Sequence, residues 1–321
     1  MEILFNSLLF SLGLILLIFS SNWLIQSSVK ISSFFRLTPL FIGLVIIAFG
    51  TSAPEAGVGI IATLKNQEGI ALANIIGSNI ANIALALGLC SIFIPLKVDK
   101  KVFRKEFPFL AVSTLALYFA SLDFIISRAE GVIFLLLLSI FCFVFIRGSR
   151  DGFIEKEIKD VKLNKLFNKI KAPFSLIALF ILSLLGIVGG AHLMVEGGVH
   201  LAKFFGITPW IIGITLFALG TSLPEIASSF TAAIKRVPSI SIGNIIGSNI
   251  FNILLVIGIV ALIKPLSVNP SVVKFELPVL LGFTFLLFTV MLTHYKIVRT
   301  EGVILTLSYI GFLIWLIMGR I

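Results

Sequence analysis

Two glutamates lie inside long apolar stretches of this chain, and they are the first candidates for chemistry. Glu55 lies near the middle of the apolar segment 38–63, and Glu225 lies at the matching place in segment 208–234. A carboxylate inside a membrane costs several kcal/mol unless it pairs, takes up a proton or binds a cation. Because no Lys or Arg lies nearby in either segment, the two glutamates predict a functional site.

Hydroxyl side chains precede each glutamate at helical spacing. Thr51 and Ser52 lie four and three residues before Glu55, so all three share one face of a helix. The second copy repeats this spacing with Thr221, Ser222 and Glu225. The sequence therefore predicts two similar groups of oxygen atoms.

A proline stands directly before each glutamate, as Pro54 and Pro224. Proline lacks a backbone N–H and crowds the carbonyl group four residues earlier. We therefore expect both helices to break or kink in the middle of the membrane, with free carbonyl groups near residues 48–51 and near their equivalents. Broken helices in transporters offer such backbone oxygens to cations.

The apolar segments that follow add further oxygen ligands. Ser78 and Asn82 are four residues apart and share a helix face, as do Ser248 and Asn252. The intervening Asn residues point elsewhere and are expected to hold helices together. A site of carboxylate, hydroxyl, amide and carbonyl oxygens suits hard cations such as calcium or sodium. Two negative charges balance one divalent ion or two monovalent ions, which is a natural basis for exchange.

The composition determines which elements position these residues. The chain has 321 residues, of which 58% are hydrophobic and 12% are charged, against roughly 25% charged residues in soluble domains. This excludes soluble enzymes, disordered chains and disulfide scaffolds. We predict an all-α polytopic membrane protein. Its ten expected transmembrane helices are 3–26, 38–63, 69–94, 107–123, 130–147, 173–195, 208–234, 238–263, 275–293 and 302–319.

An internal repeat organises these helices. The run NIIGSNI at 74–80 recurs at 244–250, and Gly50-Thr51-Ser52 also recurs 170 residues later. Five spans in each half is an odd number, so we expect two inverted-topology repeats with broken helices at the midplane. The predicted units are a first five-helix repeat, a cytoplasmic basic connector and a second five-helix repeat, at 1–147, 148–171 and 172–321. The connector fits a short surface helix or a solvated linker equally well.

The charge distribution predicts the orientation. Of the 25 Lys and Arg residues, 19 fall on one side of the expected bundle and six on the other. Basic loops stay in the cytoplasm, so both termini are expected outside the cytoplasm. We expect an integral protein of the plasma (inner) membrane, with the lipid bilayer as its surroundings. The formal net charge of +10 is then an orientation signal, and nucleic acid is not an expected partner.

The paired motifs resemble a known family. GTSAPE at 50–55 and GTSLPE at 220–225, each followed by NIIGSN, look like the α-repeats of the sodium/calcium exchanger family of the cation/calcium antiporter superfamily. The resemblance covers the spans, both repeats and the predicted orientation. It implies a secondary active antiporter that exchanges sodium for calcium by alternating access. It also implies that the first and sixth spans slide across the other eight.

The resemblance also implies roles for individual residues. Calcium would be bound by Glu55 and Glu225 with backbone oxygens at Thr51 and Thr221. Sodium would be bound by a larger set: Ser52, Ser78, Ser222, Ser248 and the carbonyl groups of Ala48 and Ala218. Many members have Asp where this chain has Asn252, opposite Asn82, so the centre of this site lacks that acid.

Three alternatives to sodium/calcium exchange remain at this stage. A calcium or other cation/proton antiporter of the same fold would use the two glutamates as proton carriers. A cation channel is disfavoured because a pore requires a ring of ligands, and an intramembrane enzyme lacks a visible Ser/His or paired-Asp arrangement. We expect no enzymatic activity and no cofactor beyond the transported calcium and sodium. The sequence leaves the oligomeric state open, and a monomer is one of the states that it allows.

Overall fold

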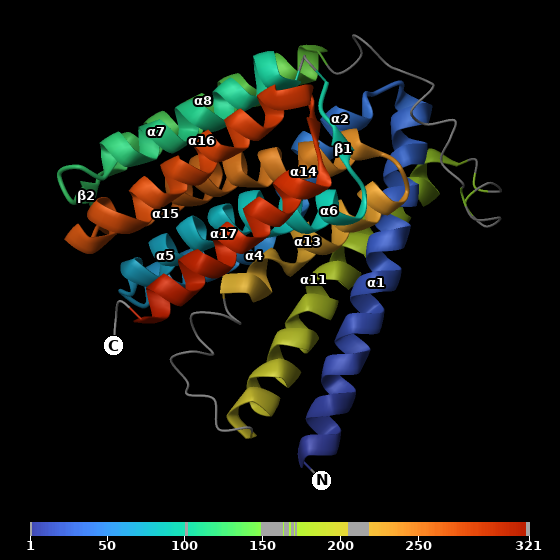
Figure 1. The fold of residues 1–321 in the computed structure, drawn as a ribbon, viewed down its shortest axis with the longest axis horizontal. Helices are drawn as coiled ribbons and strands as arrows, with labels where there is room; N and C mark the ends of the chain where they lie inside the picture. The colour runs from blue at the N-terminus through green and yellow to red at the C-terminus, as the bar shows by residue number, and fades with distance from the viewer. Residues whose placement is uncertain are drawn as a thin grey trace.

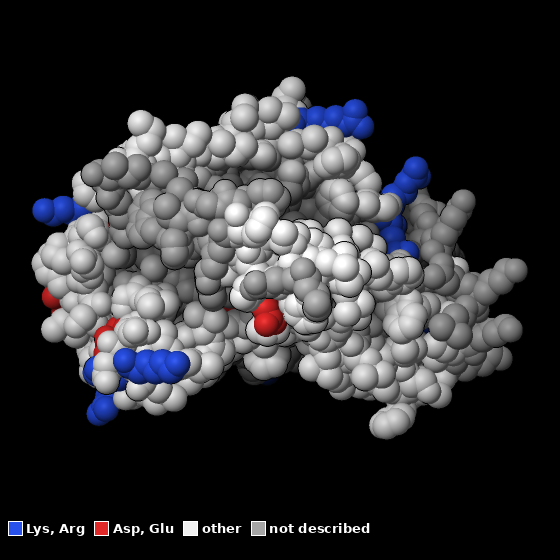
Figure 2. Space-filling model, turned by 90° about the horizontal axis from the view of Figure 1, so that it is seen from below, with Lys and Arg blue, Asp and Glu red and all other residues white. Residues whose placement is uncertain are grey.

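The computed structural model describes residues 2–99, 102–148, 163, 167, 170, 172–204 and 218–318. Within these residues the regular structure is helical apart from four two-residue strands. Eight helical stretches of the described chain are long and apolar enough to cross a membrane, and most of the described side chains on the face seen in Figure 2 are uncharged. The predicted class, an all-α membrane protein, is confirmed.

The helices of the first half fall on the predicted segments (Figure 1). Several contain π-helical stretches, labelled η. The elements are α1 (Glu2–Phe35), α2 (Pro39–Phe41), η1 (Ile42–Ile47), α3 (Ala48–Thr51), α4 (Ala53–Leu64), α5 (Glu68–Ile80), η2 (Ala81–Ala86), α6 (Leu87–Phe93), β1 (Leu96–Lys97), η3 (Val102–Glu106), α7 (Phe107–Ala120), β2 (Ile125–Ile126) and α8 (Arg128–Gly148).

The second half repeats this order in its described residues. Its elements are α11 (Pro173–Phe204), α13 (Ala218–Ile234), α14 (Pro238–Phe251), η5 (Asn252–Ile257), α15 (Gly258–Ile263), β3 (Leu266–Ser267), η6 (Val272–Glu276), α16 (Leu277–His294), β4 (Lys296–Ile297) and α17 (Arg299–Met318). Adding 170 to the bounds of β1 and η3 gives the bounds of β3 and η6. The sequence repeat is therefore also a repeat of local structure.

The strands pair across the two halves. β1 pairs antiparallel with β4, with Leu96 opposite Ile297. β2 pairs antiparallel with β3, with Ile126 opposite Leu266. Each pair joins one strand of the first half to one strand of the second, so the two halves are fastened together at both pairs.

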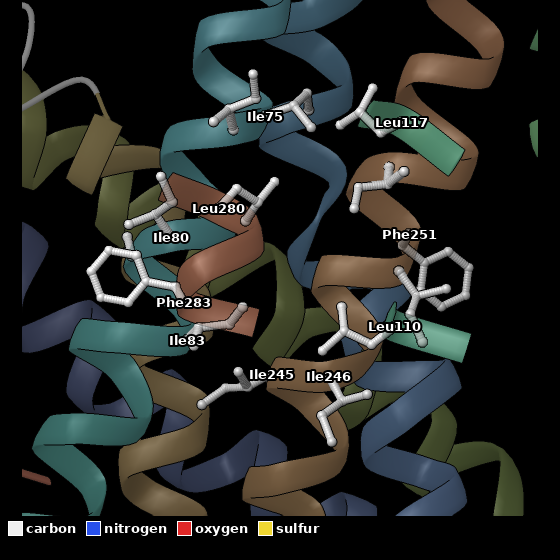
Figure 3. Close-up of a cluster of buried hydrophobic side chains, with 14 of the residues drawn as sticks. Ile75, Ile80, Ile83, Leu110, Leu117, Ile245, Ile246, Phe251, Leu280 and Phe283 are labelled. Atoms are coloured by element: carbon white, nitrogen blue, oxygen red, sulfur yellow. The ribbon is translucent and has the colours of Figure 1, made fainter. Parts of the chain in front are cut away.

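The most buried helices hold the predicted serine and asparagine ligands that follow each glutamate in the chain. The run from Glu68 to Phe93 and the run from Pro238 to Ile263 are about four-fifths buried, more than any other candidate span. Figure 3 shows the isoleucines of both runs, including Ile75, Ile83 and Ile245, gathered in one hydrophobic cluster. These two runs therefore form the inner layer of the bundle.

Helices α1 and α11 form a separate pair that extends beyond the rest of the bundle in Figure 1. They pack backbone to backbone. A Cβ atom on Gly190 would lie 2.8 Å from the Leu17 nitrogen and 2.9 Å from the Gly13 oxygen. Only glycine permits this approach, because any side chain at position 190 would overlap α1.

The predicted connector, 148–171, lies almost entirely outside the described residues. Of its described positions, Phe167 is fully buried. Leu163 and Ile170 are partly buried against an apolar cluster of the bundle. The Lys30 ammonium group donates a hydrogen bond to the Ile170 carbonyl at 3.2 Å. Leu163 and Ile170 thus pack against a cluster that includes Leu24 of α1 and Leu176 of α11.

Candidate ion-binding site

The two predicted carboxylates come together in the interior of the bundle. Glu55 lies in the first turn of α4 and Glu225 lies inside α13, and the exposed fraction of each is 0%. They are close enough to interact electrostatically. Within the described part of the chain, none of their four oxygen atoms has a hydrogen-bond partner. Two buried carboxylates without a protein counter-charge are costly unless cations or protons neutralise them.

Each carboxylate is flanked by hydroxyl groups from both halves. Ser78 and Thr221 lie beside Glu55, and their hydroxyl oxygens are 3.2 Å apart. Across the site, Thr51 and Ser248 lie beside Glu225, and their hydroxyl oxygens are 3.3 Å apart. The threonine beside each glutamate therefore belongs to the opposite half. Neither half could build such a site alone.

The remaining predicted serines lie in the same interior region. Ser52 and Ser222 are 1% and 0% exposed, and neither hydroxyl has a hydrogen-bond partner among the described residues. A buried hydroxyl without a partner loses its hydrogen bonds to water at a cost of about 1–3 kcal/mol. A bound cation would use the lone pairs of these oxygens.

The predicted amides complete the centre of the site. The Asn82 amide nitrogen donates to the Asn249 side-chain oxygen at 3.2 Å, and the Asn252 amide nitrogen donates to the Asn79 side-chain oxygen at 3.1 Å. Each bond crosses between the halves. These bonds orient both amide groups and leave the side-chain oxygens of Asn82 and Asn252 buried without a hydrogen-bond partner in the described structure.

The predicted helix break occurs in one copy only. In the first copy α3 ends at Thr51 and Ser52 leaves the helix with a ψ angle of 2° before α4 begins. In the second copy α13 runs without interruption through Pro224. The second helix is therefore not broken, and the alternative of a kink at Pro224 stays a prediction. A proline removes a single backbone hydrogen bond, and close packing within a bundle lets the helix continue.

The Ala48 carbonyl group differs from the expectation as well. We expected free carbonyl groups near residues 48–51, but the Ala48 oxygen accepts the Ser52 N–H at 3.0 Å and the Thr51 hydroxyl at 3.4 Å. It is not free, because the break lies after it rather than at it. Ala218 begins α13, and the residues before it lie outside the described part of the chain.

Two asparagines contact the site although the sequence did not lead us to predict them. Asn244 accepts a hydrogen bond from the Thr51 hydroxyl at 3.3 Å, and Asn74 accepts one from the Thr221 hydroxyl at 3.2 Å. Both stand four residues before a predicted serine ligand, in the identical NIIGSNI runs. That spacing places them on the same helix face and could have revealed them.

The chemistry of the site is that of hard oxygen ligands. It offers two carboxylates, hydroxyl groups and two amide oxygens. No group of three or more His, Cys, Asp or Glu side chains that could hold a metal occurs in the described ranges. Such a set fits calcium or sodium better than zinc or copper.

The sequence pattern of the sodium/calcium exchanger protein family matches residues 5–147 and 175–318. The chain belongs to the sodium/calcium exchanger family. The matched residues include both glutamates and both asparagine-rich runs, so the site described above lies within the family pattern.

Two relatives of similar length support this family assignment. The sodium/calcium exchanger MaX1 of Methanosarcina acetivorans is 30% identical over an alignment of 353 positions, gaps included, covering 96% of this chain and 97% of that protein. The inner membrane protein YrbG of Escherichia coli is 30% identical over 309 residues, covering 95% and 94%. Both alignments extend over nearly the whole length of this chain.

A solved structure gives the same result for the fold. The sodium-calcium exchanger NCX_Mj superposes with a TM-score of 0.82 at 30% sequence identity, covering 96% of this chain and 97% of that chain. That structure was obtained from a study of extracellular ion exchange and induced occlusion of the binding site. The present chain therefore has the same overall helix arrangement as NCX_Mj.

Proposed function

We propose that this chain is a secondary active antiporter that exchanges sodium for calcium by alternating access. One observation carries the proposal: two buried carboxylates, which have no ion-pair partner among the described residues, lie close enough to interact, each beside a threonine of the opposite half. Two carboxylates match one divalent ion or two monovalent ions in charge. Inverted repeats around one central site are the usual basis of alternating access.

The ligands in this proposal are those that the family resemblance implies, and the burial of the two carboxylates supports them. Calcium is bound by Glu55 and Glu225, with backbone oxygens of the two neighbouring threonines. Sodium is bound by the hydroxyl oxygens of Ser52, Ser78, Ser222 and Ser248 and by the carbonyl oxygens of Ala48 and Ala218. The amide oxygens of Asn82 and Asn252 line the centre of the site. The ions are substrates, and the proposal includes no resident cofactor and no enzymatic step.

We further propose ten membrane spans in two inverted five-helix repeats, with both termini outside the cytoplasm. The strand pairs support this orientation. β1 and β4 lie in loops that the positive charges assign to the cytoplasm, and β2 and β3 lie in loops assigned to the outside. Since only loops on the same side of a membrane can pair, the pairing agrees with the charge assignment. The plasma membrane is the proposed location.

Transport into vesicles tests the function. Vesicles containing the protein are loaded with sodium and diluted into sodium-free buffer, and calcium uptake is followed with and without a protonophore. We expect uptake that requires the sodium gradient and survives the protonophore. Glu55→Gln and Glu225→Gln are expected to abolish it, whereas Glu196→Gln, whose side chain is 51% exposed on α11, serves as a control. Uptake that ignores sodium but needs a proton gradient would refute the proposal and identify a proton-coupled antiporter.

A further inference from the structure

The two halves of the ion site are braced unequally. The amide nitrogen of Asn244 donates to the Ser228 hydroxyl at 2.9 Å and to the Ser229 hydroxyl at 2.8 Å, and it also lies 3.4 Å from the Glu225 carbonyl oxygen. All of these groups are buried. Asn244 thereby ties α14 to the turn of α13 that carries Glu225.

The equivalent asparagine of the first half has no such partners. The residues 170 positions before Ser228 and Ser229 are Val58 and Gly59, which carry no hydroxyl. The Asn74 amide nitrogen is buried and has no hydrogen-bond partner in the described structure. The helix that carries Glu55 therefore lacks the brace that holds Glu225.

An independent feature shows the same inequality. The first-copy helix is interrupted at Ser52, three residues before Glu55, whereas α13 is continuous through Pro224. The continuous helix and the side-chain brace both stabilise the second half, and the first half has neither.

We propose that Asn244, acting through Ser228 and Ser229, is a positioning residue that holds Glu225 and Thr51 in a fixed geometry. This inference rests on the proposed function, because it concerns the same ion site. Glu225 is the preorganised ligand, and Glu55 is the ligand that moves to fit the ion that is bound. The braced half sets the size of ion that the site prefers, since a ligand that cannot move discriminates between ionic radii.

A pair of equivalent variants tests the inequality. Asn244→Ala and Asn74→Ala each remove one acceptor for a threonine hydroxyl, but only Asn244→Ala also removes the donors to Ser228 and Ser229. Binding of calcium and of the larger barium ion is measured by calorimetry on the purified protein, and sodium-driven calcium uptake is measured in vesicles. We expect Asn244→Ala to weaken calcium binding about tenfold and to reduce the calcium-to-barium preference, and Asn74→Ala to weaken it about threefold or less with the preference kept.

Two milder variants guard against misfolding. Ser229→Ala removes a single acceptor. Its matched control, Ser113→Ala, removes a buried hydroxyl that, in the part of the chain that the structure describes, donates within its own helix α7 at 2.6 Å. Ser229→Ala is expected to shift the calcium-to-barium preference in the direction of Asn244→Ala, whereas a loss of folded protein lowers the binding capacity for both ions equally. Ser113→Ala is expected to change neither.

A variant that adds the missing partner makes the test sharper. Val58→Ser is preferred to Gly59→Ser, because a Cβ at Gly59 would lie 3.1 Å from the Val256 side chain and 3.3 Å from the Val260 side chain. With Ser at position 58, Asn74→Ala is expected to cost more calcium affinity than it costs in the original chain.

Three results would overturn the inference: equal shifts for the two asparagine variants, an unchanged ion preference in Asn244→Ala, or a Ser113→Ala effect as large as that of Ser229→Ala. The failure of the proposed function has a different signature. If the protein binds calcium but sodium does not drive uptake, the exchange proposal fails and the binding data still decide the inference. If no divalent ion binds, both are overturned.

Discussion

Substitution of Gly247 by alanine should separate the helices that align the two halves of the site. A Cβ atom at this position would overlap the Leu44 carbonyl oxygen of η1 and lie 2.7 Å from the Ala48 Cβ atom. Restoring an ordinary contact of 3.4 Å to Ala48 requires α14 to move by about 0.7 Å, and the overlap with Leu44 requires more. The next residue, Ser248, lies 3.3 Å from the Thr51 hydroxyl, so the same movement breaks that hydrogen bond.

The size of the effect follows from these distances. Overpacking a buried contact costs about 1–3 kcal/mol of folding free energy. The lost hydrogen bond contributes about 0.5–1.5 kcal/mol, which corresponds to as much as a tenfold weaker calcium affinity. We therefore expect Gly247→Ala to lower the unfolding temperature and to raise the calcium concentration for half-maximal uptake severalfold.

Gly57 provides the matched control for this substitution. It lies in α4, two residues after Glu55, and a Cβ atom there would meet nothing within 4 Å. Gly57→Ala should leave calcium uptake unchanged and raise helix stability by about 0.5–1 kcal/mol. Thermal unfolding in detergent and vesicle uptake are measured for both variants. A Gly247→Ala protein with unchanged calcium affinity, or a Gly57→Ala protein that is equally impaired, would refute the reasoning.

Three further predictions concern other contacts. Asn79→Ala removes the acceptor that orients the Asn252 amide, so the sodium concentration that half-saturates uptake should rise severalfold, and an unchanged sodium dependence would contradict this. Lys264→Met breaks an ion pair whose lysine is 44% exposed, so the free energy of unfolding should fall by no more than about 1 kcal/mol, and a larger loss in thermal unfolding would show a buried role. Gly190→Leu should sharply reduce the yield of folded protein, since α1 approaches there, whereas Gly189→Leu should be tolerated because a Cβ at that position meets nothing within 4 Å. Equal yields of the two leucine variants would argue against the packing of α1 on α11.

The sequence was sufficient to predict the helices and the two carboxylates. Apolar runs of the right length and acids inside them are local signals, and the repeat doubled the evidence for each. The hydroxyl groups near the site could also be found, because residues four apart share a helix face. Each of these inferences uses residues that are close in the chain.

The sequence could not predict which residues meet across the halves. The placement of Thr221 beside Glu55, rather than beside Glu225, depends on how the two repeats dock, and no spacing within one repeat encodes that. The difference between the break at Ser52 and the continuous helix at Pro224 also depends on packing, because both copies have the same local motif. The π-helical stretches were missed for a similar reason, since a stretch such as η2 gives no distinct sequence pattern.

The exchange of contacts between the halves has a consequence for how the chain is put together. β1 pairs with β4 as β3 pairs with β2, and the bond from Asn82 to Asn249 has its counterpart in the bond from Asn252 to Asn79. Contacts that occur twice, with the roles of the two sides swapped, are the signature of an isologous subunit interface. The chain is in this sense a dimer of its own halves on one polypeptide, in which the second subunit arrives already attached and at fixed stoichiometry.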